Sequence, residues 1–208
     1  KCQNCQSTEH STLLCDKKPS NNSYCKSATT TSSCYKSLVK TLIVKGKADD
    51  EEIGVMEDPG STDSFVLTAR ARGWKLKGEP LVLQLEGINE TKRVETELFK
   101  VPIRDKFGKL HYVECYGLDE ISSCELPDQN DYAKLCEKFK VSPDDVRRPP
   151  NIDLLLSVKD NFLMSDTVGG DKDGIKLYSG PLGMCFMGDM GSDSRHQSYP
   201  VRATRVLK

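Results

Sequence analysis

The sequence predicts a mostly β domain with one main helix, preceded by a small metal-binding segment and a flexible linker. Two observations predict the β domain: between residues 36 and 192, apolar and polar residues alternate over many short runs, and turn-forming residues separate these runs. Alternation with a period of two is typical of strands that bury one face. A third observation sets the first 35 residues apart, since they are rich in Ser, Thr, Asn, Lys and Cys and build no core.

The bulk composition limits the alternatives. A chain of 208 residues suits one main domain with an appendage. Lys and Arg number 30 and Asp and Glu 31, so the formal net charge is −1 and no global field draws the chain to nucleic acid or to an acidic membrane. No apolar run approaches the roughly 18 residues that a membrane-spanning helix needs, so we expect no membrane partner.

The strands of the first half follow from their patterns. The runs "SLVKTLIVKG" and "EEIGVME" predict two antiparallel strands joined by the turn "KGKADD", and the second strand delivers Asp58. The run "SFVLTARARGW" predicts a short strand and a helical turn that ends at Gly73. "EPLVLQLEG" and "KRVETELFKVPI" alternate around "GINET", which predicts a hairpin with its tip near residues 87–91.

The second half contains the helix. "FKVPIRDKFGKLHYVECYG" predicts another hairpin that turns at "DKFG". The main helix is expected near residues 131–140, because four side chains repeat at helical spacing with charged residues between them: Tyr132, Leu135, Cys136 and Phe139. "IDLLLS" is a continuous apolar run typical of a strand inside a sheet, and "GIKLYSGPLGMCFMGD" predicts at least two more strands before a polar tail over residues 193–208.

A metal site is predicted within residues 1–17, followed by a linker over residues 18–35. The segment "CQNCQSTEHSTLLC" separates its ligand-type residues by two, four and four positions. Zn²⁺ prefers four tetrahedral ligands from thiolate sulfur and imidazole nitrogen, and so polar a segment needs metal binding to supply its folding energy. The predicted ligands of one structural Zn²⁺ are Cys2, Cys5, His10 and Cys15.

The other cysteines leave an alternative open. Nine cysteines is an odd number, and Cys25 and Cys34 have no paired spacing, so we expect free thiols rather than a secreted disulfide framework. The sequons at Asn21 and Asn89 keep an extracellular, disulfide-linked β protein as an alternative.

The turn "DPGS" is the candidate catalytic motif. Asp58, Pro59, Gly60 and Ser61 follow the apolar end of a predicted strand. On composition alone this is an ordinary surface turn, or a turn that holds Asp58 out for chemistry. Asp153 is expected to be a cap or a solvated group, and the sequence identifies no partner for His111.

The order of these pieces resembles that of retropepsin-like aspartic proteases, and most closely the protease segment of Bel/Pao-type LTR retrotransposon polyproteins. A strand with Asp-x-Gly-Ser comes first, then "KLKGEPLVLQLEGI", then "NIDLLLSV" and "LYSGPLGMCFMG". The resemblance covers about residues 35–190 and implies a closed β barrel or sandwich over residues 36–192. The metal segment is similar to the CCHC zinc knuckle of nucleocapsid proteins, which binds single-stranded RNA or DNA.

The resemblance also implies a function. It implies a homodimer in which Asp58 of each subunit is catalytic, without a cofactor for catalysis, and a substrate-binding flap formed by Gly87, Ile88 and Asn89. The substrate would be a polypeptide, the gag-pol polyprotein itself. The implied location is intracellular, in the cytoplasm and in virus-like particles.

Two residues depart from the family pattern. Pro59 stands where the family has Ser or Thr, whose hydroxyl braces the two aspartates across the dimer, and Ser157 stands where the family usually has Gly. The alternative is therefore a catalytically inactive retropepsin-like fold that acts as a dimerisation, peptide-binding or nucleic-acid-binding module.

Overall fold

The computed structural model describes residues 37–48, 51–86, 91–122, 126–190 and 205–207. The chain divides into two compact units, Lys1–Ser33 and Cys34–Lys208, and every described residue belongs to the second. The predicted zinc ligands (Cys2, Cys5, His10 and Cys15) and the predicted flap tip (Gly87, Ile88 and Asn89) therefore lie outside the described residues.

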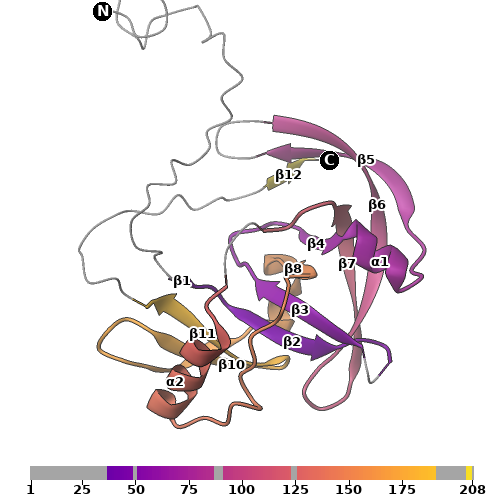
Figure 1. The fold of residues 1–208 in the computed structure, drawn as a ribbon. Coiled ribbons are helices and arrows are strands. Elements are labelled where there is room, and N and C mark those ends of the chain that lie inside the picture. The colour runs from indigo at the N-terminus through magenta and orange to yellow at the C-terminus, as the bar shows by residue number, and fades with distance from the viewer. Residues whose placement is uncertain (1–36, 49–50, 87–90, 123–125, 191–204, 208) are drawn as a thin grey trace, which may run out of the picture. The chain divides into compact units, whose positions relative to one another are not determined.

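The second unit is mostly β with one main helix, which confirms the predicted fold class at this level (Figure 1). The two other helical segments of the described residues are short. The elements are β1 (Ser37–Leu38), β2 (Thr41–Lys45), β3 (Glu52–Glu57), β4 (Ser64–Leu67), α1 (Thr68–Gly73), β5 (Glu79–Glu86), β6 (Thr91–Arg104), β7 (Leu110–Leu118), α2 (Gln129–Phe139), β8 (Leu154–Leu156), the 3₁₀ helix η2 (Val158–Leu163), β9 (Asp166–Gly170), β10 (Lys176–Gly180), β11 (Gly183–Asp189) and β12 (Arg205–Leu207).

The larger sheet closes on itself. Its strand order is β12-β5-β6-β2-β3-β8-β4-β7, and β6 also pairs with β7, so six strands from β6 to β7 form a ring. Most neighbours are antiparallel, but β3 runs parallel to β8 and β4 runs parallel to β7. The hairpin of β5 and β6 extends beyond the ring, and β12 lies along its outer strand (Figure 1).

The core fills this ring. Apolar side chains of β2, β3, β4, β6, β7 and β8 face inward, and the most completely buried include Val55, Val66, Phe99, Val101 and Leu154. All three residues of β8 are buried, as the continuous run "LLL" predicts for a strand covered on both faces.

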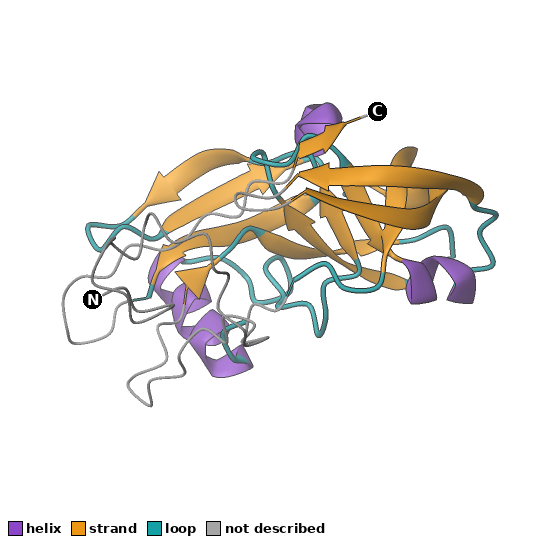
Figure 2. Ribbon diagram, turned by 90° about the horizontal axis from the view of Figure 1, so that it is seen from above, coloured by secondary structure: helices purple, strands orange, loops and turns teal. Residues whose placement is uncertain are grey.

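A smaller sheet, in the order β1-β11-β10-β9, carries the main helix. Tyr132, Leu135 and Cys136 of α2 are buried in one cluster with Phe186 of β11, as the helical spacing predicts. The helix begins two residues earlier than expected because the Asp128 side chain caps it by accepting from Asp131 N at 2.9 Å. Helices α1 and α2 lie at opposite ends of the unit (Figure 2).

Several elements were not predicted. The 3₁₀ helix η2 and strand β9 were missed, and residues 205–207, within the expected polar tail, form β12 against β5. Asp153 was wrongly expected to be a cap or a solvated group. It is 5% exposed and accepts from Gly54 N at 3.0 Å and from Arg70 Nε at 2.9 Å. No helix in the described part of the chain has the length and apolarity to cross a membrane.

Candidate functional site

The Asp58 turn directly follows β3. Glu57 ends the strand and is buried, Asp58 is partly exposed, and Pro59 and Gly60 are exposed. Gly60 N donates to Asp58 Oδ1 at 2.9 Å, and Ser61 N donates to Asp58 O at 3.1 Å. A Cβ at Gly60 would lie 3.1 Å from Asp58 Oδ1, so a glycine lets the backbone approach the carboxylate. The sequence thus folds locally into a turn that orients the Asp58 carboxylate with a backbone donor.

Two backbone hydrogen bonds attach this turn to the segment after β8. Asp58 N donates to Leu156 O at 2.9 Å, and Val158 N donates to Ser61 O at 3.1 Å. They continue the parallel pairing of β3 with β8, in which Glu57 is opposite Leu156. The turn is therefore fixed to β8 and to the start of η2, and Ser157 lies between the two attachment points.

A polar network surrounds Ser157, which has no exposed surface. Ser157 N donates to Ser64 Oγ at 2.9 Å, and Ser157 Oγ accepts from Lys159 N at 3.3 Å, which caps η2. Ser64 Oγ lies 3.1 Å from Ser157 Oγ and 2.5 Å from Asp160 Oδ2. Burial raises the pKa of the Asp160 carboxyl, against the opposing effect of the Ser64 hydrogen bond. From the sequence, Ser157 was noted only as a departure from glycine. In the structure its hydroxyl has two polar neighbours, Ser64 Oγ and Lys159 N.

A second polar cluster surrounds the Glu57 carboxylate. Glu57 Oε2 accepts from Ser165 Oγ at 2.6 Å and from Ser165 N at 3.1 Å, and Lys40 Nζ is 3.6 Å away. Lys40 also donates to Ser165 O at 2.9 Å and lies over the Tyr178 ring. These contacts hold the end of β3 against β9 and β10. Sequence reasoning missed Lys40 and Ser165, because the Ser165 contact spans 108 positions of the chain.

The cysteines of the described residues are structural. Cys115, Cys136 and Cys185 are free and buried. Burial raises the pKa of the Cys185 thiol to about 12, so it stays protonated and is a poor nucleophile at neutral pH. The described residues contain no group of three or more His, Cys, Asp or Glu side chains that could hold a metal ion.

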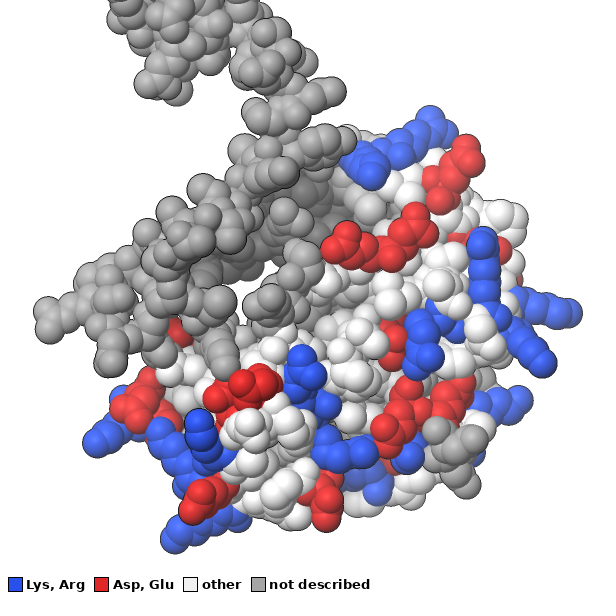
Figure 3. Space-filling view, viewed as in Figure 1, with Lys and Arg blue, Asp and Glu red and all other residues white. Residues whose placement is uncertain are grey.

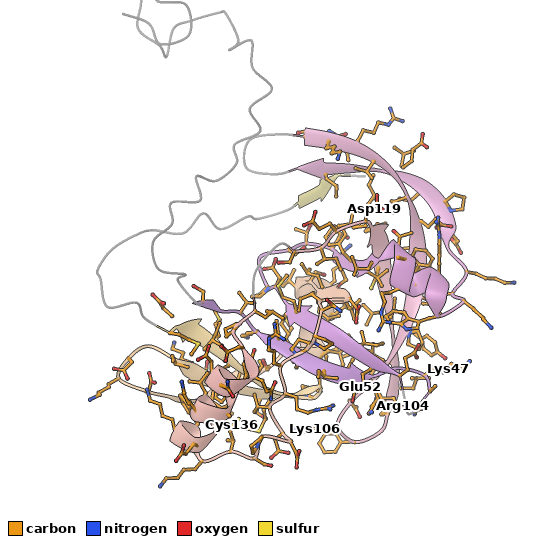
Figure 4. All side chains as sticks on the ribbon, in the orientation of Figure 1. Lys47, Glu52, Arg104, Lys106, Asp119 and Cys136 are labelled. Carbon is orange, nitrogen blue, oxygen red and sulfur yellow. The ribbon has the colours of Figure 1, made fainter. Side chains whose placement is uncertain are left out.

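A cavity of the described residues and the charged side chains at the start of β3 are not part of the Asp58 turn. A cavity of about 350 Å³ is lined by Lys106, Arg147, Ser179 and Leu182, among others, and by no residue of the turn. Lys47, Glu52 and Arg104 lie near the other end of β3 (Figure 4), where Arg104 donates to Lys47 O at 3.0 Å. Acidic and basic side chains are interspersed on the face shown in Figure 3. This face therefore offers no uniform basic surface for a nucleic acid.

The site contains one carboxylate with the exposure and the backbone donor suited to acid–base chemistry. Among the described residues, only Gly60 N donates to the Asp58 carboxylate, which leaves Oδ2 available to a water or to a second carboxyl group. Comparison with known proteins adds nothing to this geometry: no family model matches the chain, and neither does any curated protein or solved structure.

Proposed function

We propose that this chain is a retroviral-type aspartic endopeptidase that acts as a homodimer and cleaves the polyprotein to which it belongs. The observation that carries the proposal is the Asp58 turn. A partly exposed carboxylate follows a buried strand, receives one backbone hydrogen bond, and is attached on both sides to the β8–η2 segment. A rigid support of this kind is what a catalytic carboxylate needs.

The chemistry requires two copies of Asp58. Two carboxylates a few ångströms apart cannot both ionise, so they share one proton. The ionised Asp58 removes a proton from a water, whose oxygen bonds to the peptide carbonyl carbon, while the protonated Asp58 donates its proton to the carbonyl oxygen. Collapse of the tetrahedral intermediate then breaks the C–N bond. The leaving nitrogen takes the proton that the first Asp58 removed from water, and a hydroxyl of the intermediate returns a proton to the second Asp58. Because the dyad must retain one proton, cleavage is favoured in acid.

Exposed apolar side chains beside the Asp58 turn support the proposal of a homodimer. Val158, whose N–H donates to Ser61 O, is 47% exposed, and Phe162, four residues later in η2, is 59% exposed. Apolar side chains that are exposed next to a functional turn are typical of a surface that a partner covers. A second copy seated on η2 would bring its own Asp58 turn to the first.

The β5–β6 hairpin suits a polypeptide substrate. Its strands pair without interruption from Glu79 opposite Leu98 to Glu86 opposite Thr91, and it extends beyond the closed ring (Figure 1). We propose that its tip, Gly87 to Asn89, closes over an extended peptide and excludes water.

The N-terminal segment is proposed as a CCHC zinc knuckle that binds single-stranded RNA or DNA, in a protease that works inside the cell and in virus-like particles. Metal analysis of the full chain refolded with Zn²⁺ should find one zinc per chain. The double variant Cys5→Ser and His10→Ala should lose it, while the control Cys25→Ser keeps it. Full zinc retention in the double variant would refute the proposed ligands.

Cleavage itself is the decisive test. The full chain is assayed against a peptide mixture across the acidic range, with and without a statine-type inhibitor, and its mass in solution is measured by sedimentation. The proposal expects a dimer and inhibitor-sensitive cleavage. A dimer that cleaves nothing would instead support the inactive binding module, which one observation favours: Pro59 has neither a hydroxyl nor an N–H to brace a second Asp58.

A further inference from the structure

Ser64 lies within hydrogen-bond distance of two other residues, Ser157 and Asp160, next to the backbone segment that holds the Asp58 turn. Ser64 begins β4, Ser157 follows β8, and Asp160 lies in η2. Ser64 is 2% exposed and Ser157 is 0% exposed, so water does not compete for their hydrogen bonds. The Ser64 hydroxyl is within hydrogen-bond distance of both partners, at 2.5 Å from Asp160 Oδ2 and 3.1 Å from Ser157 Oγ.

The number of protons in this network limits its hydrogen bonds. A serine hydroxyl has one proton and two lone pairs, and Ser64 Oγ already accepts from Ser157 N at 2.9 Å. An ionised Asp160 cannot donate, so the Ser64 proton points to it in a short charge-assisted bond. The hydrogen bond between the two hydroxyls then runs from Ser157 Oγ to Ser64 Oγ. A protonated Asp160 can donate to Ser64 Oγ, and the Ser64 proton is then free to point to Ser157 Oγ.

We propose that Ser64, Ser157 and Asp160 form a proton-linked brace for the Asp58 turn, in which protonation of Asp160 reverses the hydrogen bond between Ser64 and Ser157. Ser157 transmits the change because it lies between the two backbone bonds that hold the turn, Asp58 N to Leu156 O and Val158 N to Ser61 O. In acid the network carries no charge, and Ser157 Oγ accepts from both Ser64 Oγ and Lys159 N. At neutral pH it contains a half-buried negative charge. The brace itself does not depend on the proposed function; only an effect of the brace on cleavage by Asp58 would rest on it.

The charges around Asp160 come from two elements. Lys159, its neighbour in η2, lowers the pKa of Asp160, while Glu114 of β7 raises it, and Lys159 is itself paired with Asp63. Cys115 of β7 is buried, and burial together with the nearby Asp160 charge raises the pKa of its thiol, so it adds no charge. Burial is the largest effect, and it raises the pKa of the Asp160 carboxyl from its ordinary value.

The test follows both ends of the brace in the full chain. The Asp160 carboxyl carbon and the backbone amides of Ser157 and Val158 are monitored by NMR between roughly pH 3 and 7. We expect one shared midpoint above the ordinary aspartate value. Ser64→Ala should raise the Asp160 midpoint further, by about half a unit or more, because a bond to the charged form is lost. In this variant the signal of the Ser157 amide should no longer shift with the titration of Asp160. Asp144→Asn, at an exposed acid, is the control and should change neither signal.

Two further variants keep the outcome decisive. If Ser64→Ala does not fold, Ser157→Ala retains the packing and should reduce the response of the Val158 amide. Asp160→Asn should abolish the shared midpoint. A Ser157 amide that does not follow Asp160, or an Asp160 midpoint at or below the ordinary value, overturns the brace whether or not the chain cleaves peptides. A shared midpoint in a protein without cleavage would leave the brace standing and refute the proposed protease.

Discussion

Two aspartate turns of this chain use their carboxylates differently. In the β6–β7 turn, Asp105 Oδ1 accepts from Phe107 N and Lys109 N, both at 2.9 Å, and Asp105 Oδ2 lies 2.9 Å from His111 Nε2. The His111 hydrogen bond, followed by those backbone donors, lowers the pKa of the Asp105 carboxyl. The Asp58 carboxylate instead receives one hydrogen bond within the described residues, from Gly60 N.

The difference separates a structural acid from a candidate catalytic one. Both oxygens of Asp105 are occupied by its own hairpin, so this carboxylate closes the turn and has little capacity left for a ligand. Asp58 has the same residue type in a turn of similar length, but its Oδ2 is available. What distinguishes the two turns is therefore the number of donors that surround each carboxylate, and substitutions can test this.

The largest effect is expected from removing each carboxylate in turn. Asp58→Asn should abolish acid-favoured cleavage, with a loss of about a thousandfold or more, because no residue replaces the missing acid–base group. Asp105→Asn should lower stability and leave the rate per folded molecule unchanged. The measurements are initial cleavage rates from acid to neutral pH and urea unfolding of both variants. Cleavage that survives Asp58→Asn would refute the catalytic assignment.

The next effect concerns the residue that follows Asp58. Pro59→Ser restores a hydroxyl and an N–H at the position where the family has a cross-dimer brace, and a misplacement of about an ångström can cost on the order of a hundredfold. We expect cleavage to accelerate by up to about that factor. Pro59→Ala is the matched control, since it removes the ring without adding the hydroxyl. If the two variants have equal rates, the missing hydroxyl is not the limiting defect.

A smaller effect, on dimerisation, is expected from the exposed apolar surface beside the Asp58 turn. Val158→Asp places a charge on the face proposed to contact a second copy, and it should weaken dimerisation by about ten- to a hundredfold. Val168→Asp is the control, because Val168 is 58% exposed but lies on β9. Sedimentation at several concentrations measures both. Equal weakening by the two substitutions would show that η2 is not the interface.

The sequence predicted local features well because they depend on residues close in the chain. The Asp58 turn, the hairpin at "DKFG" and the helix with Tyr132 and Leu135 were all located from neighbouring residues. The supports of the site could not be predicted in this way. Ser64 and Ser157 are 93 positions apart, and their contact depends on β4 pairing with β8, which no local pattern specifies.

The contact of His111 with Asp105 was not predicted from the sequence either, although the two residues are close in the chain. No partner was identified for His111, and Asp105 is only six positions away. The contact depends on the register of the hairpin, in which Ile103 is opposite His111 and the turn residue Asp105 folds back. A histidine shortly after a turn aspartate was the available signal, but the hairpin register was needed to interpret it.

The smallest predicted effect is the pH dependence of that pair. Because the pKa of Asp105 is lowered in the folded state, its ionised form adds stability that is fully present above the unfolded pKa and is lost as the pH falls through the folded pKa. His111→Phe keeps a ring beside Phe162, whose centroid is 5.9 Å from that of His111, but removes the largest cause of the shift. The variant should therefore be less stable than the parent near pH 5, and the deficit should shrink toward roughly pH 2. Urea midpoints across this range measure it, with Asp105→Asn in both backgrounds as the control. A deficit that is constant with pH would mean that His111 contributes through packing alone.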